Sequence, residues 1–138
     1  MHTLKLLAKI ENLPQWMQFI ATCAREQGMP SKRIREIELA LEEVLVNVFR
    51  YAYPEDIGDM EVTCAVDAHQ RFIIDIVDGG IPFDPLSLEA PDLTADLDSR
   101  QVGGLGVFLV RKLMDEVSYR REDDQNILQV TVDPKLKR

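Results

Sequence analysis

The chain has few cysteines and histidines for its length. Of its 138 residues only two are cysteine, Cys23 and Cys64, and two are histidine. The cysteines form no Cys-x-x-Cys pair and have no histidine at ligand spacing, whereas a structural zinc site needs about four such ligands. The composition therefore excludes a structural zinc site and predicts two buried thiols.

The sequence also lacks a long hydrophobic run. No stretch approaches the roughly 18–20 apolar residues of a membrane span, and the first residues lack the basic start and cleavage site of a signal peptide. The hydrophobic fraction of 46% is nevertheless enough for a buried core. We therefore expect one cytoplasmic domain over residues 1–138 that does not contact a membrane.

Basic residues are outnumbered by acidic ones, 16 Lys and Arg against 24 Asp and Glu, and the net charge is −8. An acidic surface repels the phosphates of nucleic acids, so the composition argues against direct DNA or RNA binding and is compatible with protein partners. Any bound nucleotide must then be held by backbone amides, a metal ion and a few basic side chains.

Hydrophobic periodicity predicts a series of strands and three helices. The expected strands cover residues 3–10, 60–67, 72–78, 117–121 and 128–132, with a turn over residues 122–126. The expected helices cover residues 13–28, 31–53 and 103–115, with Asn12 and Ser31 placed to cap the first two.

This order predicts an α+β two-layer sandwich. Short turns between neighbouring strands imply a mixed, mostly antiparallel sheet, and three helices suffice to cover one of its faces. A doubly wound α/β fold is excluded by the same pattern. Residues 79–102 have no clear period and contain three prolines. A loop of this length in a compact domain is usually functional, so we predict a lid there.

The strand at residues 72–78 ends on an acidic residue. Asp78 is in phase with Ile74 and Ile76, so its carboxylate is expected on the core side of the sheet. A buried charge without a partner is costly. Asp78 therefore either binds a ligand or stabilises a turn, and the pattern leaves both interpretations open.

A glycine cluster precedes the third helix. Gly103, Gly104 and Gly106 would let the backbone approach an anion closely, and the amides at a helix N-terminus attract one. The run matches neither a P-loop nor a Gly-x-Gly-x-x-Gly motif. Arg100, just before it, either neutralises phosphate charge or is a solvated loop residue.

The second helix carries two polar residues one turn apart. Glu43 and Asn47 can reach one point. Asn47 offers a neutral oxygen to Mg²⁺, which takes only one or two protein ligands in addition to water and substrate phosphates. Glu43 can then orient or deprotonate a nucleophile. Taken alone, the pair also fits an ordinary surface row.

Together these motifs resemble the GHKL (histidine kinase-like) ATPase superfamily with its Bergerat fold. The motifs similar to its N, G1 and G2 boxes are Glu43-x-x-x-Asn47, Asp78-x-Gly80-x-Pro82-Phe83-Asp84 and Gly103-Gly104-Leu105-Gly106. Within the superfamily the chain is most similar to the small anti-sigma factor serine-protein kinases. It departs from many of them at Tyr51 and Phe108, where histidine or polar residues are frequent.

The resemblance implies ATP and Mg²⁺ as cofactors. Asp78, with Gly80 beside it, would accept a hydrogen bond from the adenine amino group, and Asn47 would coordinate Mg²⁺. Glu43 would be the catalytic base toward a serine hydroxyl of a partner protein. The phosphates would be contacted by Arg100, Gly103, Gly104 and Gly106.

The implied function is that of an ATP-dependent serine-protein kinase acting as an anti-sigma factor. It would phosphorylate a STAS-type anti-anti-sigma protein and sequester a sigma factor, and a homodimer is the implied assembly. The alternative is an ATP-binding module that sequesters a regulator without kinase activity. A histidine kinase is disfavoured because neither His2 nor His69 falls on a long predicted helix.

Overall fold

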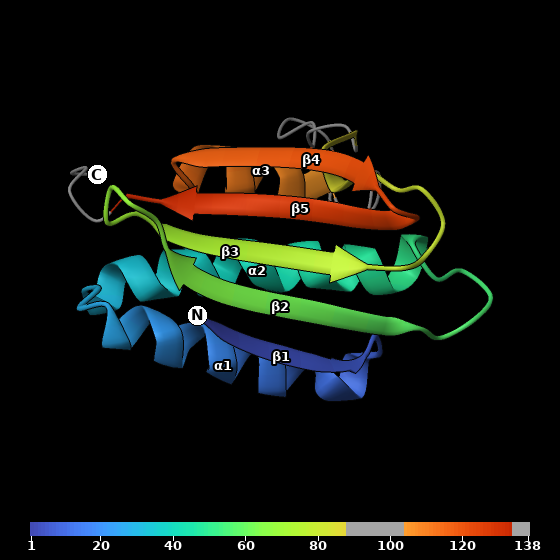
Figure 1. Cartoon of the computed structure of the whole chain (residues 1–138), viewed down its shortest axis with the longest axis horizontal. Helices are drawn as coiled ribbons and strands as arrows, with labels where there is room; N and C mark the ends of the chain where they lie inside the picture. The colour runs from blue at the N-terminus through green and yellow to red at the C-terminus, as the bar shows by residue number, and fades with distance from the viewer. Residues whose placement is uncertain (88–103, 134–138) are drawn as a thin grey trace, which may run out of the picture.

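The computed structural model describes residues 1–87 and 104–133. Five strands pair into one sheet in the order β1-β2-β3-β5-β4, and the helices lie along one face of that sheet (Figure 1). The strands are β1 His2–Leu7, β2 Asp59–Val66, β3 Phe72–Asp78, β4 Glu116–Glu122 and β5 Gln125–Val132. The helices are α1 Leu13–Glu26, α2 Ser31–Tyr51 and α3 Gly104–Leu113, with 3₁₀ turns η1 Ile10–Asn12 and η2 Pro85–Ser87.

This architecture confirms the predicted α+β two-layer sandwich. Each strand pair in the described part of the chain is antiparallel, so the parallel pairs that a mixed sheet allows are not found there. The helices and strands follow the predicted order. The first strand is shorter than predicted because the Ala8 N–H donates to the Gly58 carbonyl and the chain then turns into η1.

The core lies between the sheet and the helices. The side chains of β3 alternate between buried and half-buried, and Phe72, Ile74 and Ile76 are all buried at the helix-covered face. Trp16 of α1 is fully buried, and its Nε1–H donates to the Leu4 carbonyl at 3.2 Å. This alternation places Asp78, the last residue of β3, at the same face as the core residues.

Asn12 occupies the predicted N-cap position of α1, but neither of the two predicted side-chain caps is formed. Asn12 makes no capping hydrogen bond at the start of α1, and its Nδ2 instead donates to the Leu7 carbonyl at 2.9 Å. Pro30 occupies the N-cap position of α2, so Ser31 is already the first helical residue. In both cases the hydrophobic face of the helix, rather than a side-chain cap, accounts for its placement.

The turn between β4 and β5 is shorter than predicted. It consists of Asp123 and Asp124, with φ of 53° and 62°, as in the two-residue hairpin turns that favour such residues. Gln125 and Asn126 belong to β5, and Asn126 pairs with Asp78 of β3. The short turn therefore sets a register that places an amide beside the carboxylate of Asp78.

A buried arginine joins α2 to α3. Arg33 is 8% exposed, and its Nη2 lies 3.1 Å from Asp115 Oδ2. Its Nη1 donates to the carbonyl of Leu113, the last residue of α3, and to Glu36 Oε1. The side of α2 that carries Arg33 therefore faces α3.

The two cysteines are buried, as predicted. Cys23 of α1 and Cys64 of β2 are both free thiols, and burial raises the pKa of each. Separately, none of the helices formed by residues 1–87 and 104–133 is long and apolar enough to cross a membrane.

Candidate functional site

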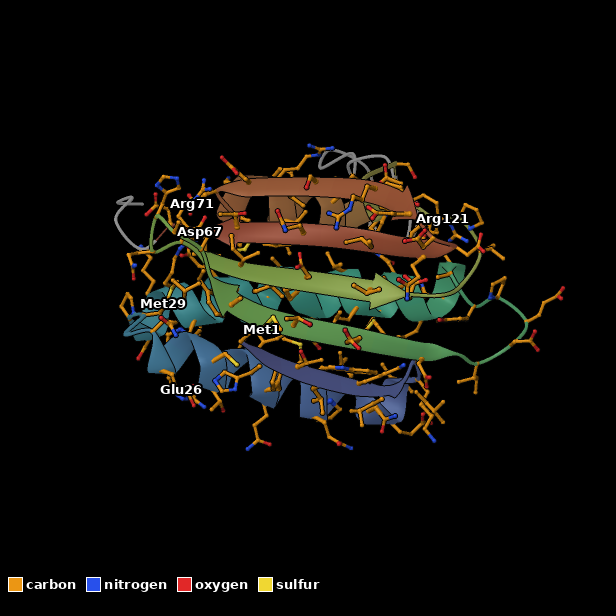
Figure 2. The ribbon with its side chains drawn as sticks, viewed as in Figure 1. Met1, Glu26, Met29, Asp67, Arg71 and Arg121 are labelled. Atoms are coloured by element: carbon orange, nitrogen blue, oxygen red, sulfur yellow. The ribbon has the colours of Figure 1, made fainter. Side chains whose placement is uncertain are left out.

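The candidate site lies where β3 ends beside the C-terminal end of α2 (Figure 1). Arg121 of β4 is at this end of the sheet, whereas Asp67 and Arg71 lie in the turn at the opposite end (Figure 2). The chain leaves β3 through Gly79 and Gly80 and runs to η2. Strand, helix and loop thus meet around Asp78.

Asp78 is 3% exposed, and two donors converge on one of its oxygens. Oδ1 accepts the Gly80 N–H at 2.9 Å and Asn126 Nδ2–H at 2.8 Å. Among residues 1–87 and 104–133, no hydrogen bond is donated to Oδ2. Burial raises the pKa of Asp78, and the hydrogen bonds from Asn126 and Gly80 together with the charge of Arg121 oppose that rise. A buried carboxylate oxygen is thus left as a hydrogen-bond acceptor.

Asn126 is the centre of a buried hydrogen-bond network. Besides Asp78, its Nδ2 donates to the Ile81 carbonyl at 2.8 Å. Its Oδ1 accepts the Phe83 N–H at 3.1 Å and the Tyr119 hydroxyl at 2.6 Å. Asn126 itself is 3% exposed. One amide therefore fixes both the carboxylate of Asp78 and the backbone of the loop that follows it.

The same loop is attached to α2 and β4. The Ile81 N–H donates to the carbonyl of Ala52, the residue after α2, at 2.9 Å. Arg121 Nη1 donates to the Gly80 carbonyl at 2.9 Å. A Cβ on Gly80 would lie 2.2 Å from the Ala52 carbonyl oxygen, so only glycine permits this approach. The beginning of the predicted lid, residues 79–102, is therefore held in place; residues 88–102 lie outside the described part of the chain.

Replacing Gly80 by alanine is expected to destabilise the fold by about 1–3 kcal/mol, because the new methyl group must displace backbone atoms of Ala52. Gly79→Ala is the matched control, since its Cβ would meet only Tyr53 Oη at 3.8 Å. Urea unfolding of both variants measures the difference. Equal stabilities would show that the Gly80–Ala52 approach is not required.

The polar row of α2, which consists of Glu43, Asn47 and Tyr51, reaches this region at its C-terminal end. Glu43 is half-buried and Asn47 is 2% exposed. Asn47 lies four helical turns from Arg33 on nearly the same side of α2, and that side packs against α3. At the end of the row, the ring of Tyr51 lies 5.2 Å from the ring of Phe83. This side of α2 therefore extends from Arg33, beside the end of α3, to Tyr51, beside the loop after Asp78.

The structure places the glycine cluster only in part. Gly104 is the first residue of α3 and Gly106 lies in its first turn, as expected for an anion site at a helix N-terminus. Gly103 and Arg100 fall outside the described residues. Phe108 of α3 is half-buried, and Lys112 Nζ lies 5.4 Å from its ring centroid. The assigned roles of these residues stay predictions.

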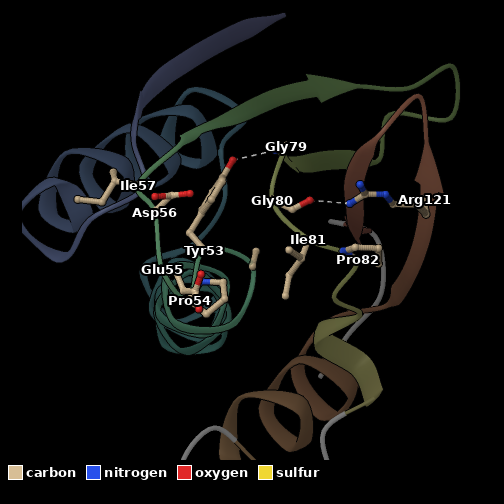
Figure 3. A pocket seen from close by; sticks show the side chains of 11 residues that line it. Tyr53, Pro54, Glu55, Asp56, Ile57, Gly79, Gly80, Ile81, Pro82 and Arg121 are labelled. Atoms are coloured by element: carbon tan, nitrogen blue, oxygen red, sulfur yellow. Dashed lines mark hydrogen bonds between the residues drawn. The ribbon is translucent and has the colours of Figure 1, made fainter.

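A cavity of about 460 Å³ has the Gly79–Pro82 loop as one of its walls (Figure 3). Its other wall is the Ala52–Ile57 segment, and Arg121 borders it. The Tyr53 hydroxyl bridges the two walls: it accepts the Gly79 N–H at 2.8 Å and donates to the Asp59 carbonyl at 2.7 Å. Gly80 is the predicted site residue that lines this cavity.

Two residues that the sequence did not indicate hold the site together, Asn126 and Arg121. Asn126 falls within the turn predicted over residues 122–126. A signal was present, however, since Asn126 is in phase with Leu128 and Val130 and is therefore on the core side if the strand is extended. No comparable signal identified Arg121, which is exposed and whose side chain, within residues 1–87 and 104–133, makes a hydrogen bond only to a backbone carbonyl.

Comparison with known proteins gives a consistent result. The family profile described as "Histidine kinase-like ATPase domain" matches residues 6–132. The serine-protein kinase RsbW of Bacillus cereus (strain G9842) is 26% identical over 129 residues, which cover 91% of this chain and 80% of that protein. RsbW of Bacillus anthracis (strain CDC 684 / NRRL 3495) is 25% identical over the same coverage.

Solved structures share the fold. The blue-light activated histidine kinase of Erythrobacter litoralis EL346 superposes with a TM-score of 0.59 at 17% identity. The match covers 88% of this chain but only 42% of that one, so this chain spans under half of that kinase. The Acinetobacter baumannii histidine kinase AdeS gives a TM-score of 0.53 at 13% identity, over 99% of this chain and 70% of the kinase chain. These likenesses support the predicted Bergerat-type fold.

Proposed function

The chain belongs to the histidine kinase-like ATPase domain family, and from this premise we propose that it is an ATP-dependent serine-protein kinase of the anti-sigma type. The observation that carries the proposal is the buried carboxylate of Asp78, whose Oδ1 is held by two donors. Oδ2 is the acceptor that the amino group of adenine would require. The printed name of the Bacillus relatives, serine-protein kinase, supports the choice of reaction.

The residues present fit the nucleotide and its metal ion. Asp78 would bind the adenine amino group, and Gly80 keeps the loop close to Ala52 at that point. Asn47 would supply a neutral oxygen to Mg²⁺, which supplies charge neutralisation for the phosphates when bound. Backbone amides at Gly104 and Gly106, with Gly103 and Arg100 before them, would contact the phosphates.

Glu43 would act on the protein substrate. Its half-buried carboxylate lies one turn before Asn47 on the row that faces α3. In the proposed reaction the serine oxygen forms a bond to the γ-phosphorus of ATP, and the bond between that phosphorus and the bridging oxygen of ADP breaks. Glu43 would orient the serine hydroxyl and accept its proton.

The proposed protein partners are a STAS-type anti-anti-sigma protein, which is phosphorylated, and a sigma factor, which is sequestered. Both would be met in the cytoplasm, and the kinase would act as a homodimer. A second candidate function is an ATP-binding module that sequesters a regulator without phosphorylating it. The exposed acidic surface fits either function, since both depend on protein partners.

Mg-ATP is expected to raise the thermal stability of the protein. At about 100 times its dissociation constant, a ligand that binds only the folded state stabilises it by about 2.7 kcal/mol. Asp78→Asn should reduce this stabilisation by Mg-ATP. The substitution replaces one carboxylate oxygen by an NH₂ group, whereas the site uses Oδ1 to accept from Gly80 and Asn126 and would use Oδ2 to accept from adenine. Differential scanning fluorimetry with and without Mg-ATP measures both. An unchanged melting temperature of the wild type would overturn the nucleotide proposal.

The reaction itself is tested by incubating the protein with radiolabelled Mg-ATP and candidate STAS proteins. Transfer of the γ-phosphate to a serine supports the kinase. If the wild type binds ATP and sequesters its partner but transfers no phosphate, the second candidate function is correct.

A further inference from the structure

One of the two groups that orient Asp78 lies outside the recognised motifs. Its Oδ1 receives hydrogen bonds from the backbone of Gly80 and from Asn126 Nδ2. A carboxylate is planar, so two donors that converge on one oxygen fix the direction of the other oxygen. Gly80 is two residues away in the same loop, whereas Asn126 reaches across from β5. The bond from Asn126 is therefore the one that ties the carboxylate to the rigid sheet.

The orientation of Asn126 is also determined. The Phe83 N–H can only donate, so the atom facing it must be the amide oxygen. The other side of the amide must then be the NH₂ group, which faces Asp78 Oδ1 and the Ile81 carbonyl, both of which accept. The Tyr119 hydroxyl donates to the same amide oxygen. Both donors and both acceptor positions of the amide are thus used.

We propose that Asn126 is a positioning residue for adenine recognition, which holds the carboxylate of Asp78 so that Oδ2 faces the amino group of the base. This inference rests on the proposed function, since it requires ATP in the site. Asn126 touches Asp78 and the 81–83 loop, and it acts on the nucleotide through them. Replacing its amide by an apolar group removes one of the two hydrogen bonds to Asp78 Oδ1 and the two hydrogen bonds to the backbone of Ile81 and Phe83.

A second amide-to-carboxylate hydrogen bond in the chain provides a matched control for the bond between Asn126 and Asp78. Gln129 Nε2 donates to Asp75 Oδ1 at 3.0 Å, which is also an amide-to-carboxylate bond between β5 and β3. Because side chains alternate along a strand, this pair lies on the opposite face of the sheet. Gln129→Leu therefore removes an equivalent bond between the same strands away from the site.

The test compares ATP with purine riboside triphosphate, which lacks the amino group, both with Mg²⁺. Affinities are measured by calorimetry for the wild type, Asn126→Leu and Gln129→Leu, with folding checked by circular dichroism. We expect the wild type to prefer ATP by about tenfold or more, which is at least about 1.4 kcal/mol. Asn126→Leu should bring the two affinities to within about threefold of each other, mainly by lowering the affinity for ATP. Gln129→Leu should keep the wild-type ratio.

If Asn126 had a purely structural role, its replacement would lower the affinity for both nucleotides equally and leave the ratio of the two affinities unchanged. This result would overturn the inference. Equal affinities in the wild type would overturn it as well. A wild type that binds neither nucleotide would instead contradict the proposed function.

If Asn126→Leu does not fold, the wild type alone decides. The side-chain ¹⁵N–H signals of Asn126 should shift more with ATP than with purine riboside triphosphate. Equal shifts would overturn the inference.

Discussion

Replacing Glu43 by glutamine is expected to lower the rate of phosphate transfer to the serine substrate by about 10²–10⁴-fold. Glutamine keeps the shape and a hydrogen-bonding oxygen but cannot accept the proton of the serine hydroxyl. Glu43 lies one turn before Asn47 on α2 and is not in the loop that would hold adenine. The affinity for Mg-ATP should therefore change little, and the loss should appear in kcat.

Glu42→Gln is the matched control for this experiment. Glu42 is the preceding residue of α2, carries the same charge and is exposed. Its replacement changes the net charge by the same amount away from the row that faces α3, so transfer should remain near the wild-type rate. Single-turnover transfer and ATP affinity are measured for both variants. Wild-type transfer by Glu43→Gln would show that Glu43 is not the base.

The fold could be predicted because its signals are local. The period-two pattern of residues 72–78 identified β3, and the same phase placed Asp78 at the core side, where the structure has it. The helical periodicity of residues 31–53 identified α2 together with its polar row. Both inferences need only neighbouring residues, because burial of one face sets the period.

The partners of these residues could not be predicted in the same way. Asn126 meets Asp78 only because a two-residue turn at Asp123 and Asp124 sets the register of β5 against β3. A turn predicted over residues 122–126 removes Asn126 from the strand and hides the contact. Likewise, the requirement for Gly80 comes from the carbonyl of Ala52, which is 28 positions earlier in the chain.

Arg33 is a second residue whose partners could not be predicted from the sequence, and its contacts bear on the stability of the fold. At the sequence level it is one of several basic residues in the first turns of a helix. In the structure it is buried because Asp115 and the end of α3 supply its acceptors. The polar row of α2 that carries Glu43 and Asn47 is therefore anchored at one end by Arg33. At the other end it is anchored by contacts to the loop after Asp78.

Replacing Arg33 by methionine is expected to lower the free energy of unfolding by about 3–5 kcal/mol. Methionine retains most of the apolar stem of the side chain but removes the cation. The side chain of Asp115 is only 5% exposed and loses the cation 3.1 Å from its Oδ2, and the carbonyl of Leu113 loses a donor. Urea unfolding of the wild type and the variant measures the difference.

Two further variants separate the ion pair from other effects of removing a charge. Arg35→Met removes the same charge from an exposed position on α2 and should change stability by no more than about 0.5 kcal/mol. Adding Asp115→Leu to Arg33→Met should recover part of the loss, because the buried carboxylate is then removed as well. A loss below about 1 kcal/mol in Arg33→Met would show that the pair does not hold α2 against α3. The double variant distinguishes a buried charge left without its cation from a simple loss of packing, since only the former is relieved by removing Asp115.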